Sequence, residues 1–213
     1  LTVPLIIEKI YRSSILPTIK KSRVLSWMNT HANLLMCKII GLKLKKTFGG
    51  KLTFFGIGGA KLDTEVETFL LRAGFPYAVG YGLTETSPLL TFTVGKTRTP
   101  GSIGHTMKGV SLRLDNINPE TGEGEIVAKG PNVMLGYYKD PERTKKAFTE
   151  DGWFKTNDLA CMDAKGRYYI KGRLSNMILG ASGENIYPEE IEQVINGIED
   201  VDESIIVPRN GKL

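Results

Sequence analysis

The segment Tyr81-Gly82-Leu83-Thr84-Glu85-Thr86 combines residue types that can bind the phosphates of a nucleotide. It follows an apolar run at residues 76–80 that is typical of a buried strand, and open α/β sheets bind ligands beyond the carboxyl ends of their strands. Gly82 allows a ligand to approach the backbone, the Thr84 hydroxyl can donate to a phosphate oxygen, and the Glu85 carboxylate can bind Mg²⁺. Tyr81 offers a flat face for a base. The same spacing is equally compatible with a plain polar turn after a strand.

Asp158 and Arg173 form a second candidate group. They flank a turn at residues 163–166, so the strands on either side can face each other and bring the two side chains together. A carboxylate in this position can bind both hydroxyls of a ribose, with the arginine assisting. The alternative is a simple cross-strand ion pair.

Several familiar chemistries have no support in the sequence. There is no GxxxxGK[ST] phosphate loop, no GxGxxG fingerprint after a strand and no GxSxG elbow. The two histidines stand alone and the two cysteines are far apart in no metal-binding spacing, which leaves almost no material for a zinc site or a Ser-His triad.

The charge balance is mildly basic, with 28 Lys and Arg against 23 Asp and Glu, and much of the excess lies before residue 52. The simplest interpretation is a solvated face, and the alternatives are a membrane-surface patch or a site for an acidic polyphosphate. We expect no nucleic-acid partner, because no aromatic-interleaved basic motif accompanies the charges.

The two cysteines are far apart in the sequence, which fits a reducing compartment, and no apolar run is long enough to span a bilayer. We therefore expect a cytoplasmic protein with, at most, peripheral membrane association, and make no prediction of its oligomeric state.

The sequence texture divides into three parts. Residues 1–98 predict an α/β unit that begins with helices over residues 3–46, interrupted at Pro17. A strand at 52–57, a glycine loop, a helix capped by Asp63 and a strand at 76–80 follow. This order of elements indicates a parallel sheet. Residues 99–172 alternate in the manner of an antiparallel β unit, including a turn at 118–122, a short helix opened by Pro141 and strands within 153–173. Residues 173–213 begin another α+β piece, with a helix over about 188–196 and a strand at 204–207.

The motifs, taken in order, resemble those of the adenylate-forming (AMP-binding) superfamily, in particular the long-chain fatty acid–CoA ligases. Any one of them is weak, whereas six in order over some 140 residues are highly specific. The matching segments are Gly58-Gly59-Ala60-Lys61-Leu62, Tyr81-Gly82-Leu83-Thr84-Glu85-Thr86, Gly101-Ser102-Ile103-Gly104, the GEI…GP…GYY block from Gly124 to Tyr138, Gly152 to Asp158, and Gly172-Arg173 through Gly183 to Glu192.

The resemblance implies a fold and a two-step reaction. The fold would be α/β plus β: part of a large N-terminal domain, with an α/β sheet subdomain and a β-barrel-like unit, followed by the start of a small C-terminal α+β domain. A fatty acid carboxylate would attack the α-phosphate of Mg·ATP to give acyl-AMP and pyrophosphate, and coenzyme A would then displace AMP. ATP, Mg²⁺ and coenzyme A are the implied cofactor and co-substrates. The alternatives are a ligase for another carboxylate, such as an aryl acid or a carrier-protein adenylation substrate, and a non-catalytic nucleotide-binding relative.

The resemblance also implies residue roles. Gly58, Gly59, Ala60, Tyr81 and Ile170 would form the adenine pocket, and Gly82 would also bind the nucleotide. Thr84 and Glu85 would be catalytic, with Glu85 the magnesium ligand, while Asp158 and Arg173 would hold the ribose. Ser175 would occupy the hinge before the small domain.

Three features depart from the family pattern. Asn157 replaces the usual glycine before Asp158, and since asparagine tolerates left-handed backbone better than most residues, we expect the site to survive. Ser175 and Asn176 replace charged residues at the hinge, which we expect to change rates and not identity. The β,γ-phosphate loop and the catalytic lysine are absent and are expected upstream of Leu1 and beyond Leu213. We therefore expect an internal fragment of a longer enzyme that has no turnover by itself.

Overall fold

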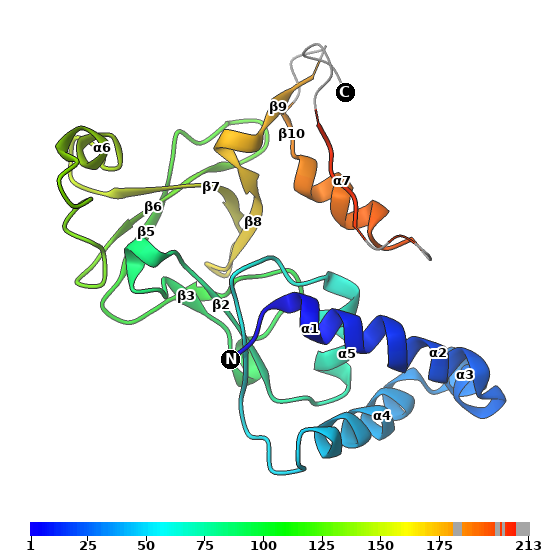
Figure 1. The fold of residues 1–213 in the computed structure, drawn as a ribbon. Coiled ribbons are helices and arrows are strands. Elements are labelled where there is room, and N and C mark those ends of the chain that lie inside the picture. The colour runs from blue at the N-terminus through cyan, green and yellow to red at the C-terminus, as the bar shows by residue number, and fades with distance from the viewer. Residues whose placement is uncertain (181–184, 199–200, 202, 208–213) are drawn as a thin grey trace. The chain divides into compact units, whose positions relative to one another are not determined.

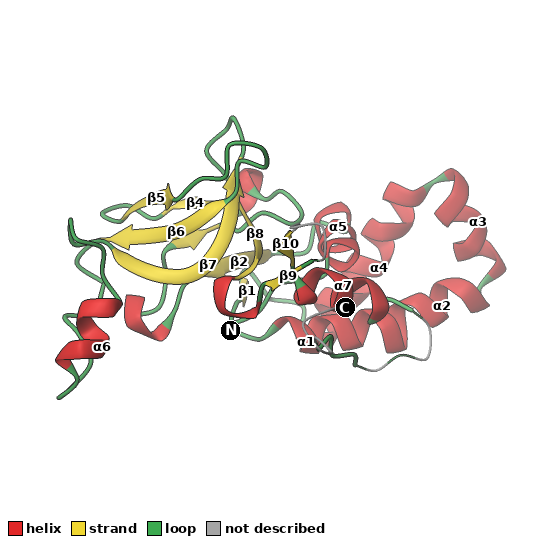
Figure 2. Ribbon diagram, turned by 90° about the horizontal axis from the view of Figure 1, so that it is seen from above, coloured by secondary structure: helices red, strands yellow, loops and turns green. Residues whose placement is uncertain are grey.

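A computed structural model describes residues 1–180, 185–198, 201 and 203–207 (Figure 1). The chain forms two compact units. Unit 1 comprises Leu1–Gly82 and Thr91–His105, and unit 2 comprises Leu83–Leu90 and Thr106–Leu213. Figure 2 distinguishes the helices from the strands. The finer division at residues 98 and 172 stays a prediction.

Unit 1 opens with a run of helices: α1 (Pro4–Ile10), a π-helical stretch (Tyr11–Ile15), α2 (Leu16–Lys21), α3 (Arg23–His31) and α4 (Asn33–Thr47). The expected break at Pro17 is wrong. The helix continues into α2 because Leu16 donates its N–H to the Tyr11 carbonyl in a wider π turn, and Pro17 lies in the first turn of α2, where a missing N–H is tolerated. The break comes at Ser22, whose hydroxyl caps α3 by accepting from the Leu25 N–H at 3.3 Å.

A strand, helix and strand follow as predicted: β1 (Phe55–Ile57), α5 (Thr64–Arg72) and β2 (Tyr77–Tyr81). Asp63 caps α5 by accepting from the N–H groups of Glu65 and Val66 at 2.8 and 3.0 Å. Gly74, with φ +65°, lets the chain leave the helix, and β1 pairs in parallel with β2.

The sheet that contains β1 and β2 is mixed and not purely parallel as expected. Its order is β1-β2-β3-β4, and β3 (Thr91–Phe92) pairs antiparallel to β2, while β4 is His105–Thr106. The chain between β2 and β3 contains only one short 3₁₀ turn, Thr84–Thr86, and is too short for the crossover that a parallel neighbour requires.

The core of unit 1 lies between the helices and β1–β2. Residues from four elements are almost wholly buried there, among them Ile7, Met36, Leu70 and Tyr77. This apolar layer fixes the directions in which β1 and β2 end, and those ends carry the glycine loop and Tyr81.

Unit 2 is built on a four-stranded antiparallel sheet of β5 (Ser111–Asp115), β6 (Gly124–Lys129), β7 (Phe154–Met162) and β8 (Tyr168–Arg173), in that order. The alternating pattern predicted this sheet. Helix α6 (Pro141–Lys146) lies in the connection between β6 and β7 and is capped by Asp140, as predicted from the Asp-Pro pair.

The last part of unit 2 follows a 3₁₀ turn at Leu174–Asn176 and contains β9 (Ile178–Leu179), β10 (Asn185–Ile186) and α7 (Pro188–Ile195). Helix α7 confirms the prediction. The strand expected at 204–207 is wrong: these residues have no strand pairing in the described part of the chain, and Ile206 donates its N–H to the Glu192 carboxylate at 2.7 Å. Gly183 and Glu184 of the hinge motif lie outside the described residues.

Candidate functional site

In unit 1, the glycine loop follows the carboxyl end of β1, and Tyr81 is the last residue of the parallel strand β2. Gly56 and Ile57 of β1 align with Ala78 and Val79 of β2, so Gly58–Ala60 and Tyr81-Gly82 leave the same edge of the sheet. Gly58 approaches the strand closely: a Cβ there would lie 3.0 Å from the Gly80 carbonyl oxygen. Gly59 has φ +90°, a conformation that glycine adopts without strain. This is the sheet edge at which α/β proteins bind ligands.

In unit 2, Thr84 and Glu85 lie in the 3₁₀ turn Thr84–Thr86, whose backbone is fixed by hydrogen bonds to the buried side chains of Thr86 and Asn132. Thr86 is fully buried, and its hydroxyl accepts from the Leu83 N–H at 2.9 Å. Asn132 donates its amide to the carbonyls of both Thr86 and Leu89 at 2.8 Å. The Thr84 side chain remains exposed. The turn therefore presents Thr84 and Glu85 on a fixed backbone.

The Glu85 carboxylate is oriented by Tyr137, whose phenol donates to Glu85 Oε1 at 3.0 Å. Burial, together with the Glu85 carboxylate beside it, raises the pKa of the Tyr137 phenol, so it stays protonated as a donor. The Arg143 guanidinium lies 4.1 Å from the centre of the Tyr137 ring. Glu85 Oε2 has no hydrogen bond to another described residue, which leaves that oxygen available to a ligand.

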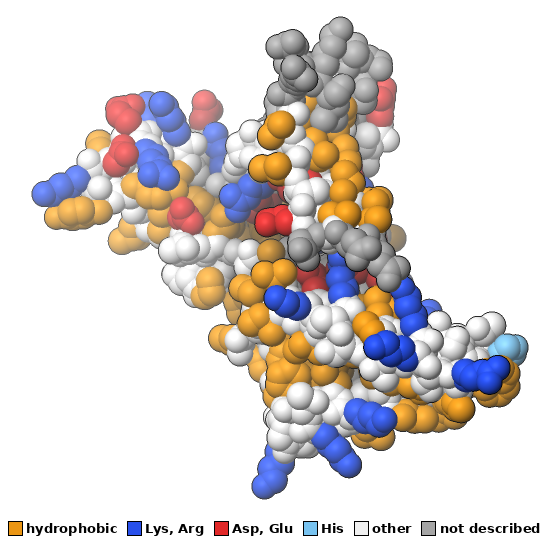
Figure 3. Space-filling view, turned by 45° about the vertical axis from the view of Figure 1, so that its right-hand side comes forward, with side chains coloured by type: hydrophobic (Ala, Val, Ile, Leu, Met, Phe, Trp, Pro, Cys, Tyr) orange, Lys and Arg blue, Asp and Glu red, His pale blue; other side chains and the backbone are white. Residues whose placement is uncertain are grey.

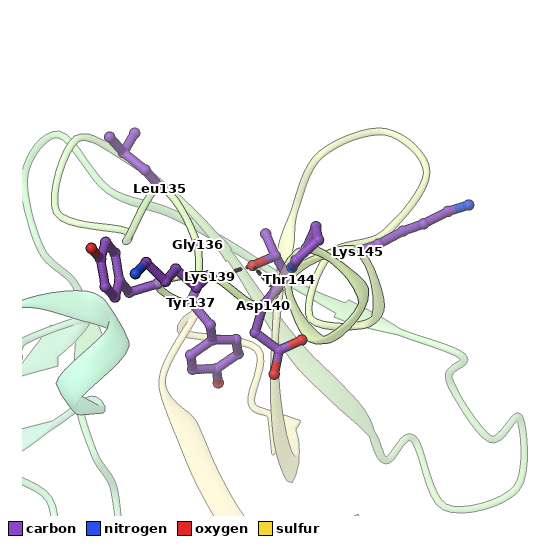
Figure 4. Close-up of a pocket in the computed structure, with 9 residues that line it drawn as sticks. Leu135, Gly136, Tyr137, Lys139, Asp140, Thr144 and Lys145 are labelled. Atoms are coloured by element: carbon purple, nitrogen blue, oxygen red, sulfur yellow. Dashed lines mark hydrogen bonds between the residues drawn. The ribbon is translucent and has the colours of Figure 1, made fainter.

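Figure 4 shows how the chain positions Tyr137, in an open hollow lined by residues 135–141, 144 and 145. The Thr144 hydroxyl accepts from the Tyr137 N–H and donates to the Asp140 carbonyl, both at 2.8 Å. Gly136 packs against this threonine so closely that a Cβ would meet Thr144 Cγ2 at 2.7 Å. The Gly-Tyr-Tyr segment and α6 together hold the phenol toward Glu85.

Asp158 and Arg173 lie directly opposite each other on β7 and β8, as predicted. Arg173 Nε is 3.1 Å from Asp158 Oδ1, and the two side chains are 56% and 7% exposed. Because the Arg173 guanidinium of this pair is exposed to solvent, the pair contributes about 0–1 kcal/mol to stability. Ile170 is on β8 and pairs with Ala160 of β7, beyond a register shift between Leu159 and Ala160.

Asn157 adopts φ +63°, so the residue in the glycine position of the motif takes up a left-handed conformation. Its backbone N–H donates to Glu125 Oε1 at 3.0 Å, and its side-chain amide donates to Ser175 Oγ at 3.0 Å. Ser175 donates in turn to Asn176 Oδ1 at 3.1 Å, and Asn176 donates to Glu189 at 2.7 Å. The positions that depart from the family pattern therefore contact one another.

The predicted site residues fall into two groups. Unit 1 brings together Gly58, Gly59, Ala60, Tyr81 and Gly82, whereas unit 2 contains Thr84, Glu85, Asp158, Ile170, Arg173 and Ser175. Within unit 2, Asp158 contacts Arg173, and Ser175 contacts Asn157. No role for Tyr137 or Asn132 could be predicted, because both are more than forty residues from the turn that they contact. Their positions inside the GP…GYY block were the only available signal.

Residues 3–138 match the AMP-binding enzyme family, which is more than half of the chain. The chain belongs to the AMP-binding enzyme family.

The chain is similar to a long-chain-fatty-acid–[acyl-carrier-protein] ligase of Arabidopsis thaliana, with 35% identity over 81% of this chain and 26% of that protein. It is 39% identical to a long-chain-fatty-acid–CoA ligase of Bacillus subtilis, over 70% of this chain and 28% of that protein. The chain thus spans roughly a quarter of the length of these relatives.

Among solved structures, o-succinylbenzoate coenzyme A synthetase of Bacillus subtilis in complex with AMP matches with a TM-score of 0.70 and 27% identity, covering 83% of this chain and 38% of that one. Another structure of the same synthetase contains ATP and a magnesium ion. These neighbours confirm the predicted fold class, α/β plus β, as part of a larger domain.

The donor set fits Mg²⁺ bound together with a phosphate ligand. Magnesium in nucleotide enzymes uses one or two carboxylates and completes its shell with phosphate oxygens and water. Glu85 offers one such carboxylate oxygen, and in the described part of the chain no cluster of three His, Cys, Asp or Glu side chains forms a metal site.

Backbone strain at position 157 yields a prediction. Asn157→Val should lower the free energy of unfolding by about 1–2 kcal/mol, because a β-branched residue at positive φ is strained. Asn157→Gly should stay within about 1 kcal/mol of the wild type. Urea unfolding of both variants measures this.

Ser175→Ala is the matched control, since it removes the hydrogen bond from Asn157 without changing the backbone at 157. If Asn157→Val were as stable as Asn157→Gly, or Ser175→Ala cost as much as Asn157→Val, the conformational explanation would be refuted.

Proposed function

We propose that the protein is part of an ATP-dependent, AMP-forming ligase that activates a long-chain fatty acid and transfers it to coenzyme A. A carboxylate oxygen would attack the α-phosphorus, forming acyl-AMP as the bond to pyrophosphate breaks. The coenzyme A thiolate would then attack the acyl carbonyl carbon, and AMP would leave. The observation that carries this proposal is the placement of a buried carboxylate, Asp158, opposite Arg173 in a chain of the AMP-binding family.

The residue roles follow from the chemistry of the side chains. Asp158 would accept hydrogen bonds from the two ribose hydroxyls, with Arg173 beside it, because a carboxylate is an acceptor-only group with several lone pairs. Gly58, Gly59, Ala60, Tyr81 and Ile170 would surround the adenine.

The turn at residues 82–85 would face the phosphates. Gly82 would leave room for them, and the exposed Thr84 hydroxyl would donate to a phosphate oxygen. Glu85, held by Tyr137, would bind Mg²⁺, which when present neutralises phosphate charge. Ser175 would occupy the hinge.

The long-chain acid and the acceptor are supported by relatives of this chain. The Bacillus subtilis ligase is named for a long-chain fatty acid and CoA, whereas the Arabidopsis thaliana ligase is named for an acyl-carrier protein. Transfer to a carrier protein is therefore the second candidate.

The substrate assignment predicts an order of activities. The longer protein should release pyrophosphate fastest with long-chain fatty acids and form thioester with coenzyme A, while aryl acids and an acyl-carrier protein give less than about a tenth of the rate. A higher rate with an aryl acid, or transfer only to the carrier protein, would contradict this assignment. A protein that binds ATP and activates no acid would be the non-catalytic relative.

The ribose assignment predicts the effect of Asp158→Ala. Charge-assisted hydrogen bonds are worth about 1.5–3 kcal/mol each, so losing two should weaken ATP binding by on the order of a hundredfold or more. Stability should fall by only about 1 kcal/mol. Calorimetric titration with ATP and thermal unfolding of the same variant measure both effects.

Asp115→Ala is the control, because Asp115 Oδ1 also lies 3.1 Å from an arginine Nε, that of Arg113, on strand β5 of the same sheet. It should lower stability and leave ATP binding unchanged. A normal ATP affinity in Asp158→Ala, with a lower melting temperature, would reduce Asp158 to a structural role.

The contact between Tyr137 and Glu85 predicts a change in magnesium dependence. Tyr137→Phe frees the Glu85 carboxylate to rotate, so the Mg²⁺ concentration that half-saturates ATP binding should rise by roughly three- to tenfold. Tyr138→Phe, at a neighbouring and largely exposed position, should leave it unchanged. An unaltered Mg²⁺ requirement in Tyr137→Phe would show that the phenol has only a packing role.

A further inference from the structure

Strand β7 has a bulge on the side that pairs with β6. Between the pairs Glu125–Leu159 and Val127–Lys155, β6 has a single residue and β7 has three. A bulge interrupts the ladder of backbone hydrogen bonds and turns the side chains within it to new directions, and bulges are common beside active sites. The three residues in this bulge are Thr156, Asn157 and Asp158.

Two buried side chains hold the backbone of this bulge. The Thr156 hydroxyl donates to the Ile126 carbonyl at 2.8 Å and accepts from the Asp158 N–H at 3.2 Å. The Glu125 carboxylate accepts from the N–H of Asn157 at 3.0 Å. Unpaired backbone groups inside a protein cost free energy, so these contacts stabilise one shape of the bulge. The backbone is therefore fixed by side chains immediately before and at Asp158.

The bulge also places two buried carboxylates, those of Glu125 and Asp158, near each other. Burial raises the pKa of the Glu125 carboxyl, and the charge of Asp158 raises it further. The acidic side chains around α6, by contrast, lie at the surface among basic ones (Figure 3). Two like charges in a buried position oppose stability, and local conflicts of this kind are expected at functional sites.

We propose that Thr156 and Glu125 are positioning residues for Asp158, because they hold the bulge in the shape that directs the Asp158 carboxylate toward the ribose hydroxyls. This inference rests on the ribose role proposed above for Asp158. Neither residue touches the nucleotide, and both act through the backbone of the bulge. A carboxylate that accepts from two hydroxyls has to meet both within hydrogen-bond distance, so a small rotation of the backbone is enough to lose these contacts.

The first test replaces Thr156 by residues of similar size. Thr156→Val removes both hydrogen bonds of the hydroxyl and should weaken binding of ATP by roughly five- to tenfold. Binding of 2′,3′-dideoxy-ATP should change by less than about twofold, because this nucleotide has no ribose hydroxyls to lose. Thr156→Ser keeps the hydroxyl and should bind both nucleotides like the wild type. Calorimetric titration with the two nucleotides measures these effects.

A second pair of variants tests Glu125 and does not depend on the folding of Thr156→Val. Glu125→Ala removes the acceptor for the Asn157 N–H and should also weaken ATP binding by roughly five- to tenfold, with little effect on 2′,3′-dideoxy-ATP. Glu125→Gln retains a side-chain oxygen that can accept from the same N–H, so it should bind both nucleotides like the wild type.

Thr149→Val is the matched control. The Thr149 hydroxyl also makes two hydrogen bonds: it donates to Asp151 at 2.7 Å and accepts from the Trp153 N–H at 2.8 Å. Thr149 precedes β7 and lies outside the bulge. The variant should lower the melting temperature and leave the affinities of both nucleotides unchanged.

Two results would overturn the inference. One is an equal loss of affinity for both nucleotides in Thr156→Val and Glu125→Ala, and the other is unchanged affinities with a lower melting temperature, because either would leave these residues with a structural role only. Asp158→Ala separates this failure from that of the proposed function. If it abolishes the preference for ATP over 2′,3′-dideoxy-ATP while the Thr156 and Glu125 variants retain it, the positioning role alone is wrong. If Asp158→Ala retains the preference, the ribose assignment is wrong and the positioning role with it.

Discussion

The pairing register of β7 and β8 is the constraint on which the candidate ribose site depends. The backbone ladder places Asp158 opposite Arg173, and a shift of one residue would turn Asp158 to the other face of the sheet. The ion pair alone cannot set this register, because a pair whose arginine is exposed to solvent contributes about 0–1 kcal/mol. Asn157 bends the strand immediately before Asp158, and its left-handed backbone is tied to Glu125 on β6. Strands β6, β7 and β8 therefore together determine the position of the Asp158 carboxylate.

The turn that carries Glu85 likewise depends on residues that lie elsewhere in the sequence. A short 3₁₀ segment has little stability of its own, and here the buried Thr86 hydroxyl and the Asn132 amide fix its backbone. Tyr137 then fixes the side chain of Glu85, and Thr144 fixes Tyr137. A carboxylate that is oriented before ligand binding loses less conformational entropy when a cation arrives.

Local features of the sequence predicted much of this arrangement. The Asp63 cap, the turn between β7 and β8 and the left-handed tolerance of Asn157 all depend on neighbouring residues, and each was confirmed. The continuous helix through Pro17 was missed, because a π turn before the proline removes the break that proline usually causes. The antiparallel β3 was missed, because the chain between β2 and β3 is too short for the crossover of a parallel strand. The contact between Tyr137 and Glu85 joins residues 52 positions apart and has no local signature. The roles of the site residues in nucleotide binding stay predictions.

The assignment of Asp158 to the ribose hydroxyls is tested most directly by a double-mutant-type cycle that combines one change in the protein with one change in the ligand. Affinities of ATP and of 2′,3′-dideoxy-ATP would be measured for the wild type and for Asp158→Ala by calorimetric titration. If Asp158 binds the ribose hydroxyls, their removal should weaken binding to the wild type by on the order of tenfold or more and should have little effect on binding to the variant. An equal loss in both proteins would show that Asp158 does not contact the ribose, and the nucleotide site would have to lie elsewhere.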